Sequence, residues 1–313
     1  MNILILKLGA TGDVVRTTPL LSRLRGQITW VTAATNTVLL EGITNNLRCF
    51  SWERRTAALD VDYDLAINLE DTVDVALFLQ TVNSRKIFGA YCDPSGSLRY
   101  TENSKPWFDL SLISSYGRQR ADRLKFLNRR TYQELVFTGL GLRFSGEPYL
   151  LPEPIETGLS GDVAIASEAG PVWPMKRWAY YDQLKSQLEN RGLIVNILPK
   201  RSSLLEHLAD VQKHKCLVGG DSLPMHFALG TGARCVTLFT CTSPWEIYDY
   251  GIQQKLISPL LREFFYKREY DRRATTAINM EQVLEAVLKA VATQRMPGLA
   301  SSECLFRLHR PEL

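Results

Sequence analysis

Short runs of apolar residues, many of them β-branched, alternate along the chain with longer stretches in which apolar residues recur at helical spacing. This alternation is typical of parallel sheets covered by helices, because each buried parallel strand needs a crossover connection before the next one. In the first half, the pattern predicts strands at 2–8, 28–33 and 65–69, and helices at about 14–24 and 128–139.

The same pattern starts again in the second half of the chain. It predicts strands at 163–167, 193–198, 216–219 and 234–239, helices at 180–190, 204–213 and 280–292, and the start of a further helix at 225–229. The last of these helices has Asn279 as its expected N-cap, and its apolar face comprises Val283, Leu284, Val287, Leu288 and Val291.

Between the two halves lies LPEPIETGLSGD at 151–162, which is rich in Pro, Gly and acidic residues and has little to bury. We therefore expect an α/β protein of two domains, 1–155 and 156–296, followed by a tail at 297–313. Each domain should hold a Rossmann-like, doubly wound parallel sheet. The two sheets should face a central cleft, with ligands beyond the carboxyl ends of the strands.

Composition narrows the function classes. The 313 residues are 45% hydrophobic with a net charge of +4, which does not indicate nucleic-acid binding. The six cysteines form no CxxC pair, and Cys216 and Cys235 lie in apolar runs, as expected for buried reduced thiols. The start of the chain lacks a basic n-region and no apolar stretch is long enough to span a membrane, so a cytoplasmic location is expected.

The basic residues are nevertheless clustered in two segments, 118–130 and 262–273. Either segment is compatible with a solvated surface or with a surface that binds an anionic ligand. The first segment falls in the domain expected to bind an acceptor.

The first strand is followed by KLGATGDV at 7–14, which places Gly9, Gly12 and Asp13 in a strand-to-helix turn. Main-chain amides at such a turn attract anions, and glycines allow a ligand to approach closely. The spacing is neither GxGxxG nor a P-loop, and the second strand ends without an acid, so nicotinamide binding is not expected. Asp13 has two interpretations: it caps the helix, or it takes a proton from an incoming hydroxyl.

In the second half, WPMKRW at 173–178 follows a predicted strand. Lys176 and Arg177 at this position suit a diphosphate leaving group, although a surface basic pair is the alternative. The sequence GGDSLPMH at 219–226 brings two glycines, Asp221 and Ser222 to the start of a helix, with Pro224 near its first position.

The amides of the 222–225 turn could hold phosphate oxygens, while Asp221 could accept hydrogen bonds from sugar hydroxyls. His226 could donate to a phosphate or simply pack in the core. Thr242, after the next strand, would reach the same cleft unless its segment is only a turn.

At these residues the chain resembles the ADP-heptose:lipopolysaccharide heptosyltransferases, the glycosyltransferase family 9 group with the GT-B fold. The matching stretches are KLGATGDVVRTTPLL at 7–21, WPMKRW at 173–178, GGDSLPMHFALGTGARCVTLFTCTSPWE at 219–246 and, more weakly, NRRTYQELVFTGLGL at 128–142. Two departures stand out: Leu223 replaces a usual glycine, and PKRSS follows strand 193–198 where the family has a glycine and an acid.

The resemblance implies an inverting, metal-independent transfer of a heptose or similar sugar from an ADP-sugar to a hydroxyl of a lipopolysaccharide-core-like acceptor. It implies Asp13 as catalytic base and Lys176 as the residue that contacts the donor diphosphate. Asp221 would hold the donor sugar. The remaining donor-binding residues expected are Gly12, Arg177, Gly220, Ser222, Pro224, Met225, His226 and Thr242.

No cofactor is expected beyond the ADP-sugar co-substrate. The expected partners are that donor and an anionic glycan or glycolipid acceptor, with contact at the inner membrane face. The Asp60-Val61-Asp62 sequence looks like a metal-binding DxD, but it precedes a strand of the first domain and is interpreted as an acidic loop. The alternatives are a GT-B transferase with another nucleotide-sugar and a soluble or protein acceptor, or a non-catalytic binding subunit.

Overall fold

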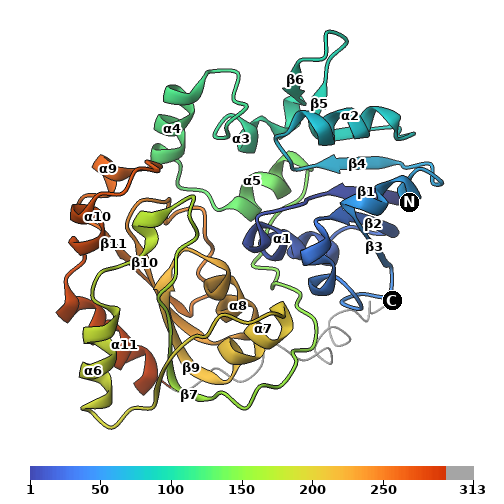
Figure 1. The fold of residues 1–313 in the computed structure, drawn as a ribbon. Coiled ribbons are helices and arrows are strands. Elements are labelled where there is room, and N and C mark those ends of the chain that lie inside the picture. The colour runs from blue at the N-terminus through green and yellow to red at the C-terminus, as the bar shows by residue number, and fades with distance from the viewer. Residues whose placement is uncertain (294–313) are drawn as a thin grey trace, which may run out of the picture.

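The computed structural model describes residues 1–293, which form two lobes, each built on one open sheet (Figure 1). The predicted tail at 297–313 lies outside the described residues. The first lobe holds a six-stranded sheet of order β3-β2-β1-β4-β5-β6, and the second a five-stranded sheet of order β11-β10-β9-β7-β8. The two-sheet α/β fold predicted from the sequence is confirmed.

The first sheet is parallel except for β6, which pairs antiparallel with β5. Its central strand β1 pairs with both β2 and β4, so the strand order reverses beside it. Its strands are β1 Asn2–Leu6, β2 Gln27–Thr32, β3 Leu47–Ser51, β4 Leu65–Asn68, β5 Ile87–Cys92 and β6 Leu98–Tyr100.

Helices cover both faces of this sheet because the strands are apolar on both sides. On one face, Ile3, Ile5 and Ile67 pack with helices α1 and α5, and on the other Leu4 and Leu6 pack with α2. The α-helices of the lobe are α1 Thr11–Thr17, α2 Val73–Thr81, α3 Lys105–Phe108, α4 Arg118–Leu127 and α5 Tyr132–Gly139.

The second sheet is parallel throughout, and its order reverses at β7, which pairs with β8 and β9. Helices α7 and α8 pack on one face, and α6 and α11 on the other. Its strands are β7 Gly161–Ala166, β8 Val195–Ile197, β9 His214–Gly220, β10 Arg234–Phe239 and β11 Gln253–Ile257. Its α-helices are α6 Tyr181–Glu189, α7 Leu204–Gln212, α8 Leu223–Thr231, α9 Leu261–Phe264, α10 Arg272–Thr276 and α11 Met280–Ala292.

Two helix predictions in the first half were wrong in detail. The helix expected at 14–24 is α only to Thr17 and continues as a 3-10 segment, Thr18–Ser22, because Pro19 removes a main-chain donor. The helix expected at 128–139 begins at Tyr132, because Thr131 and Glu134 form a reciprocal capping box that fixes its start.

Several predictions in the second half hold closely. The strand expected at 234–239 and the helix expected at 280–292 have those bounds, and Asn279 caps the helix by accepting from the amide of Glu281. Cys216 and Cys235 are buried and carry no disulfide. No helix among residues 1–293 combines the length and apolar character needed to cross a membrane.

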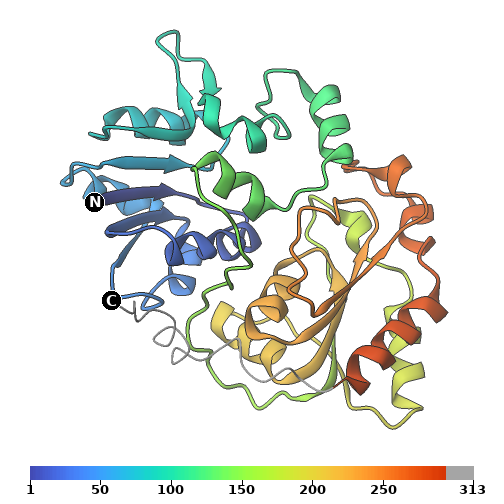
Figure 2. The same cartoon turned by 180° about the vertical axis from the view of Figure 1, so that it is seen from behind.

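The lobes touch where the carboxyl ends of the two sheets face each other. Helix α1 of the first lobe packs against α8 of the second and also contacts α5, while α4 lies beside α9 of the second lobe (Figure 2). The main-chain amide of Tyr132 at the start of α5 also donates to the carbonyl of Glu246 in the second lobe, at 2.9 Å. The turns that follow the central strands of both sheets are thereby brought to one place.

Candidate active site

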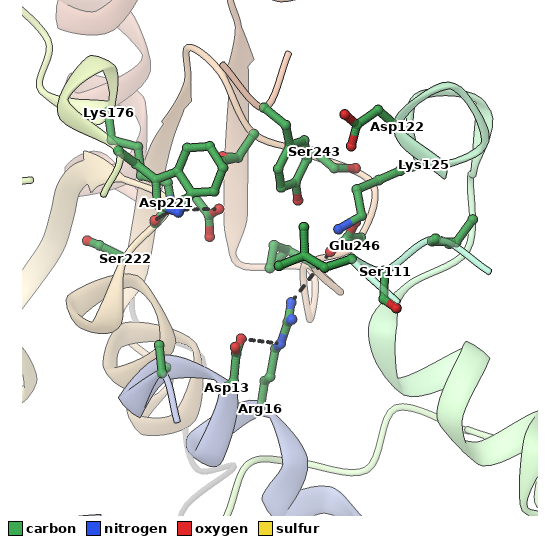
Figure 3. A pocket seen from close by; sticks show the side chains of 18 of the residues that line it. Asp13, Arg16, Ser111, Asp122, Lys125, Lys176, Asp221, Ser222, Ser243 and Glu246 are labelled. Carbon is green, nitrogen blue, oxygen red and sulfur yellow. Dashed lines mark hydrogen bonds and ion pairs between the residues drawn. The ribbon is translucent and has the colours of Figure 1, made fainter. Parts of the chain in front are cut away.

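A cleft of about 360 Å³ opens between the lobes at the carboxyl ends of the strands. From the first lobe it is lined by Asp13 and Arg16 of α1 and by Lys125 of α4, and from the second by Lys176 and Asp221 (Figure 3). Chain segments far apart in sequence therefore present their charged side chains to one space.

Asp13 lies in the first turn of α1 and does not cap it. The N-cap is Ala10, which makes no side-chain cap hydrogen bond, and the Asp13 carboxylate instead pairs with Arg16 at 2.9 Å. The Asp13 side chain remains 34% exposed, toward the cleft. Of the two interpretations raised by the sequence, capping is therefore wrong.

The surroundings of Asp13 keep it ionised. Burial acts to raise the pKa of its carboxyl, but the cations of Arg16 and Lys7 outweigh burial and lower that pKa below its ordinary value. A carboxylate that is ionised, partly exposed and fixed by a cation can accept a proton from a hydroxyl placed beside it.

A buried ion pair shapes the turn that carries Asp13. Lys7, the first residue after β1, pairs with Glu70 after β4 at 2.9 Å. The other role of Glu70 is to accept from the main-chain amides of Leu8 and Gly9, at 2.8 and 3.2 Å. Burial acts to lower the pKa of Lys7, but Glu70 and Asp13 raise it, so the ammonium stays charged.

Arg16 connects the two lobes. Its Nε faces Asp13, while its Nη1 lies 3.8 Å from Oε2 of Glu246 in the second lobe. The guanidinium also lies 4.2 Å above the ring of Tyr132. Burial alone would lower the pKa of Arg16, but Asp13 and Glu246 raise it.

In the second lobe, Lys176 is tied to the turn after β9. Its Nζ donates to the main-chain oxygen of Asp221 at 2.5 Å and lies 3.2 Å from the Asp221 carboxylate. An ammonium has three donors, so one is left for a ligand. The main chain of Lys176 also passes close to Gly220. A Cβ at position 220 would lie 2.9 Å from the Lys176 carbonyl oxygen, so glycine allows the two segments to approach.

Asp221 is also held ionised. Burial acts to raise its pKa, but the ammonium of Lys176 outweighs burial and lowers it. Thr242, from the turn after β10, is buried and lines the same cleft. The Asp221 carboxylate can therefore accept hydrogen bonds from ligand hydroxyls.

His226 of α8 is buried and neutral, since burial lowers its pKa to about 4. Its Nδ1 lies 3.3 Å from the hydroxyl of Tyr149, which itself accepts from the amide of Gln133. The phenol proton is thus free for Nδ1, and the ring proton belongs on Nε2. A neutral imidazole with Nε2–H beside the cleft can donate to an anionic ligand.

A second cleft of about 480 Å³ adjoins the first at the start of α8. It follows the carboxyl ends of β7, β8 and β9, where the strand order of the second sheet reverses. Ser222 is the N-cap of α8, with Pro224 in the first turn as predicted. Ser222 and Leu223 line both clefts, so this turn separates them.

The predicted site residues are not all brought together. The residues that line the first cleft are Gly12, Asp13, Lys176, Asp221, Ser222, His226 and Thr242, and Pro224 lines the second. Arg177 is exposed and lines neither cleft, while Met225 is in the core. Asp62 lies at the opposite end of the first sheet, where Asn2 and Asn83 contact it, so the DxD sequence is a loop remote from the cleft.

Several residues of the site escaped prediction. Glu70 directly follows the predicted strand at 65–69, and Arg16 lies one helical turn after Asp13, so both positions carried a signal. Glu246 lies in an irregular loop after β10, and its one signal was its place at the end of the family-like stretch 219–246. Within residues 1–293, no group of three or more His, Cys, Asp or Glu side chains is placed to hold a metal ion.

Comparison with solved structures shows which proteins share this fold. The E. coli heptosyltransferase WaaC with ADP has a TM-score of 0.62 and 15% identity over 93% of this chain and 100% of that one. E. coli ADP-heptose lps heptosyltransferase II has a TM-score of 0.61 and 16% identity over 93% and 98%. TibC from enterotoxigenic E. coli H10407, an iron-containing dodecameric glycosyltransferase, has a TM-score of 0.58 and 12% identity over 93% and 78%.

No curated protein sequence matches the chain significantly. Residues 169–271, however, match the model of glycosyltransferase family 9 (heptosyltransferase). This range includes Lys176, the Asp221 turn and Glu246, which line the cleft. The chain therefore resembles glycosyltransferase family 9 over this part of the second lobe, and its two-sheet fold is shared with the heptosyltransferase structures.

Proposed function

We propose that the protein transfers a heptose or similar sugar from an ADP-sugar to a hydroxyl of a lipopolysaccharide-core-like acceptor, with inversion at the anomeric carbon and without a metal ion. The observation that carries the proposal is the cleft itself. Asp13 enters it from one lobe, and the Lys176–Asp221 pair enters from the other. Similarity to structures named for ADP and for ADP-2-deoxy-2-fluoro heptose supports the choice of donor.

The two adjoining clefts suit the two ends of a nucleotide-sugar. The nucleoside would occupy the second cleft, at the point where strand order reverses, as ligands of open α/β sheets do. The diphosphate would cross the Ser222–Leu223 turn at the N-terminus of the nine-residue helix α8, and the sugar would lie in the first cleft near Asp221.

The transfer would then be a single displacement. Asp13 takes the proton of the acceptor hydroxyl while its oxygen attacks the anomeric carbon from the face opposite the diphosphate. The bond to the leaving oxygen breaks, and the configuration inverts. The free donor of Lys176, the amides of the 222–225 turn and Nε2–H of His226 stabilise the nucleoside diphosphate as charge develops on it.

The acceptor end of the cleft is cationic and polar. Arg118 and Lys125 of α4 and Arg268 line it, so helix α4 contributes more than a solvated surface. Ser243 and Glu246 are buried there, and Ser243 Oγ and Glu246 Oε1 have no hydrogen-bond partner. These groups fit a sugar acceptor that carries both anionic groups and hydroxyls.

A second candidate differs in the donor nucleotide. Lys200 and Arg201 line the second cleft at the position where the family resemblance leads one to expect a glycine and an acid. Arg201 is fixed there by Asp210 at 2.7 Å. This difference favours a test of nucleotides with bases other than adenine. The second candidate is thus a transferase with another nucleotide-sugar and a soluble or protein acceptor.

Thermal unfolding with ADP, UDP and GDP, each at equal concentration, distinguishes the donors. A ligand present at about 100 times its Kd stabilises the fold by about 2.7 kcal/mol, which is readily measured. Stabilisation by ADP alone is expected, and stabilisation by UDP or GDP alone would replace ADP in the proposal. Activity should survive dialysis against a chelator, and an absolute need for a divalent metal would contradict metal-independent transfer.

A further inference from the structure

Glu246 belongs to the second lobe, but its carboxylate lies among residues of the first. It is 4% exposed, with Oε2 3.8 Å from Nη1 of Arg16 and Oε1 3.7 Å from Nζ of Lys125. Its main-chain carbonyl accepts from Tyr132 at 2.9 Å, which fixes the loop on the first lobe.

Arg16 therefore faces two carboxylates at once. Its Nε lies 2.9 Å from Asp13, and Figure 3 shows its side chain extending from Asp13 toward Glu246. The rings of Tyr132 and Trp107, at 4.2 and 5.5 Å from the guanidinium carbon, restrict where that side chain can go. The guanidinium is buried, so its charge is shared between the two acids with little screening by water.

We propose that Glu246 is a positioning residue for the transfer reaction: from the second lobe it shares the guanidinium of Arg16 with Asp13, and so leaves the Asp13 carboxylate free to take a proton. The proposal rests on the proposed role of Asp13 as base. Without the charge of Glu246, Arg16 would have only Asp13 as an anionic partner and would bind it more tightly, which makes Asp13 a weaker base.

Asp13 and Glu246 also face titratable groups other than Arg16. Asp13 also faces Lys7 after β1, the neutral His226 of α8 and Asp221 after β9. Glu246 also faces Lys125 of α4 and Tyr266. Since Glu246 and Asp13 come from different lobes, the strength of the base depends on the lobes being docked as they are here.

The test is a double-mutant cycle in which Glu246→Gln is made in the wild type and in Arg16→Met. In the wild-type background we expect kcat to fall by roughly tenfold, less than the 10²-fold or more typical of losing a general base. The donor KM should stay unchanged. In the Arg16→Met background the glutamine should have little further effect, because the residue through which Glu246 acts is gone.

Equal loss in both backgrounds would overturn the proposal, since it would show an effect independent of Arg16. Glu246→Asp keeps the charge and should restore most of the lost kcat. Glu285→Gln, the same change on an exposed position of α11, is the matched control. If Glu246→Gln does not fold in thermal melts, Glu246→Ser removes the same charge and takes its place.

A measurement without substrate separates this proposal from the proposed function. In protein labelled with ¹⁵N-arginine, the Nε–H signal of Arg16 should move downfield in Glu246→Gln, as Nε–H turns to donate a hydrogen bond to Asp13, and stay near its wild-type position in Glu246→Asp. An unmoved signal in the glutamine variant would refute the sharing. A moved signal in a protein that transfers no sugar from any donor would refute only the proposed function.

Discussion

Gly12 of α1 lies directly against the imidazole of His226 on α8. A Cβ at position 12 would come within 2.7 Å of the imidazole Cδ2, so only glycine lets the two helices approach this closely. The contact brings the turn that carries Asp13 to the turn that carries Asp221, and so joins the two lobes at the cleft.

Replacement of Gly12 by alanine tests this contact. The methyl group must displace a buried imidazole that is hydrogen-bonded to Tyr149, and such overpacking costs about 1–3 kcal/mol. Denaturant unfolding should show that loss. Gly9→Ala in the same turn is the control, because a Cβ there meets nothing within 4 Å. Equal stability of the two variants would mean that the approach of the helices is not tight.

Asp13→Asn keeps the size of the side chain but removes its ability to take a proton. Turnover should fall by about 10²-fold or more, while the affinity for the nucleoside diphosphate, measured by calorimetry, stays near the wild-type value. Asp74→Asn, on the exposed side of α2, controls for loss of a charge in the same lobe. Near-normal turnover in Asp13→Asn would remove Asp13 from the role of base.

Lys176→Met should act on donor binding. The variant loses a charge-assisted contact to the diphosphate, so its affinity for the nucleoside diphosphate should fall by about tenfold or more. It also leaves Asp221 without its cation, which should lower kcat as well. Lys185→Ala on α6, which lines neither cleft, is the matched control. An unchanged Kd for the diphosphate in Lys176→Met would contradict the assignment.

The buried His226 predicts a pH dependence of stability. Its pKa is about 4 in the folded protein against 6.5 in the unfolded chain, so the unfolded state binds the proton more strongly. The contribution of His226 to the free energy of unfolding is complete above pH 6.5. It is lost as the pH falls toward 4, by up to about 3 kcal/mol. Asp13 and Asp221, whose pKa values are lowered, lose their contributions only below 3.8.

The measurement compares urea unfolding of the wild type and His226→Asn from pH 7.5 to 4.5. The pKa values of His207 and His214 are also lowered, so the difference between the two proteins, rather than the wild-type slope, isolates His226. The wild type should lose more stability than the variant over this range. Parallel curves would show that His226 can be protonated in the folded state without cost.

The ends of a helix could be predicted from the sequence where neighbouring residues determine them. The bounds of α11 follow from Asn279 and the apolar stripe behind it, since both act within a few residues. Strands β3 and β11 were not predicted, because they are only partly buried and their sequences, LRCFS and QQKLI, lack a long apolar run. Such strands form because a neighbouring strand offers hydrogen bonds, which is a tertiary condition.

The sequence by itself determined that two α/β units follow one another and that Asp13, Lys176 and Asp221 stand after predicted strands. The reason is that the spacing of apolar residues and the positions of turn residues are local features, which the order of residues alone specifies. Only the tertiary structure decided that Arg177 faces solvent, that Arg16 and Glu246 meet, and that Lys7 pairs with Glu70. These contacts join residues up to 230 positions apart, and their geometry depends on how the two lobes pack rather than on local spacing.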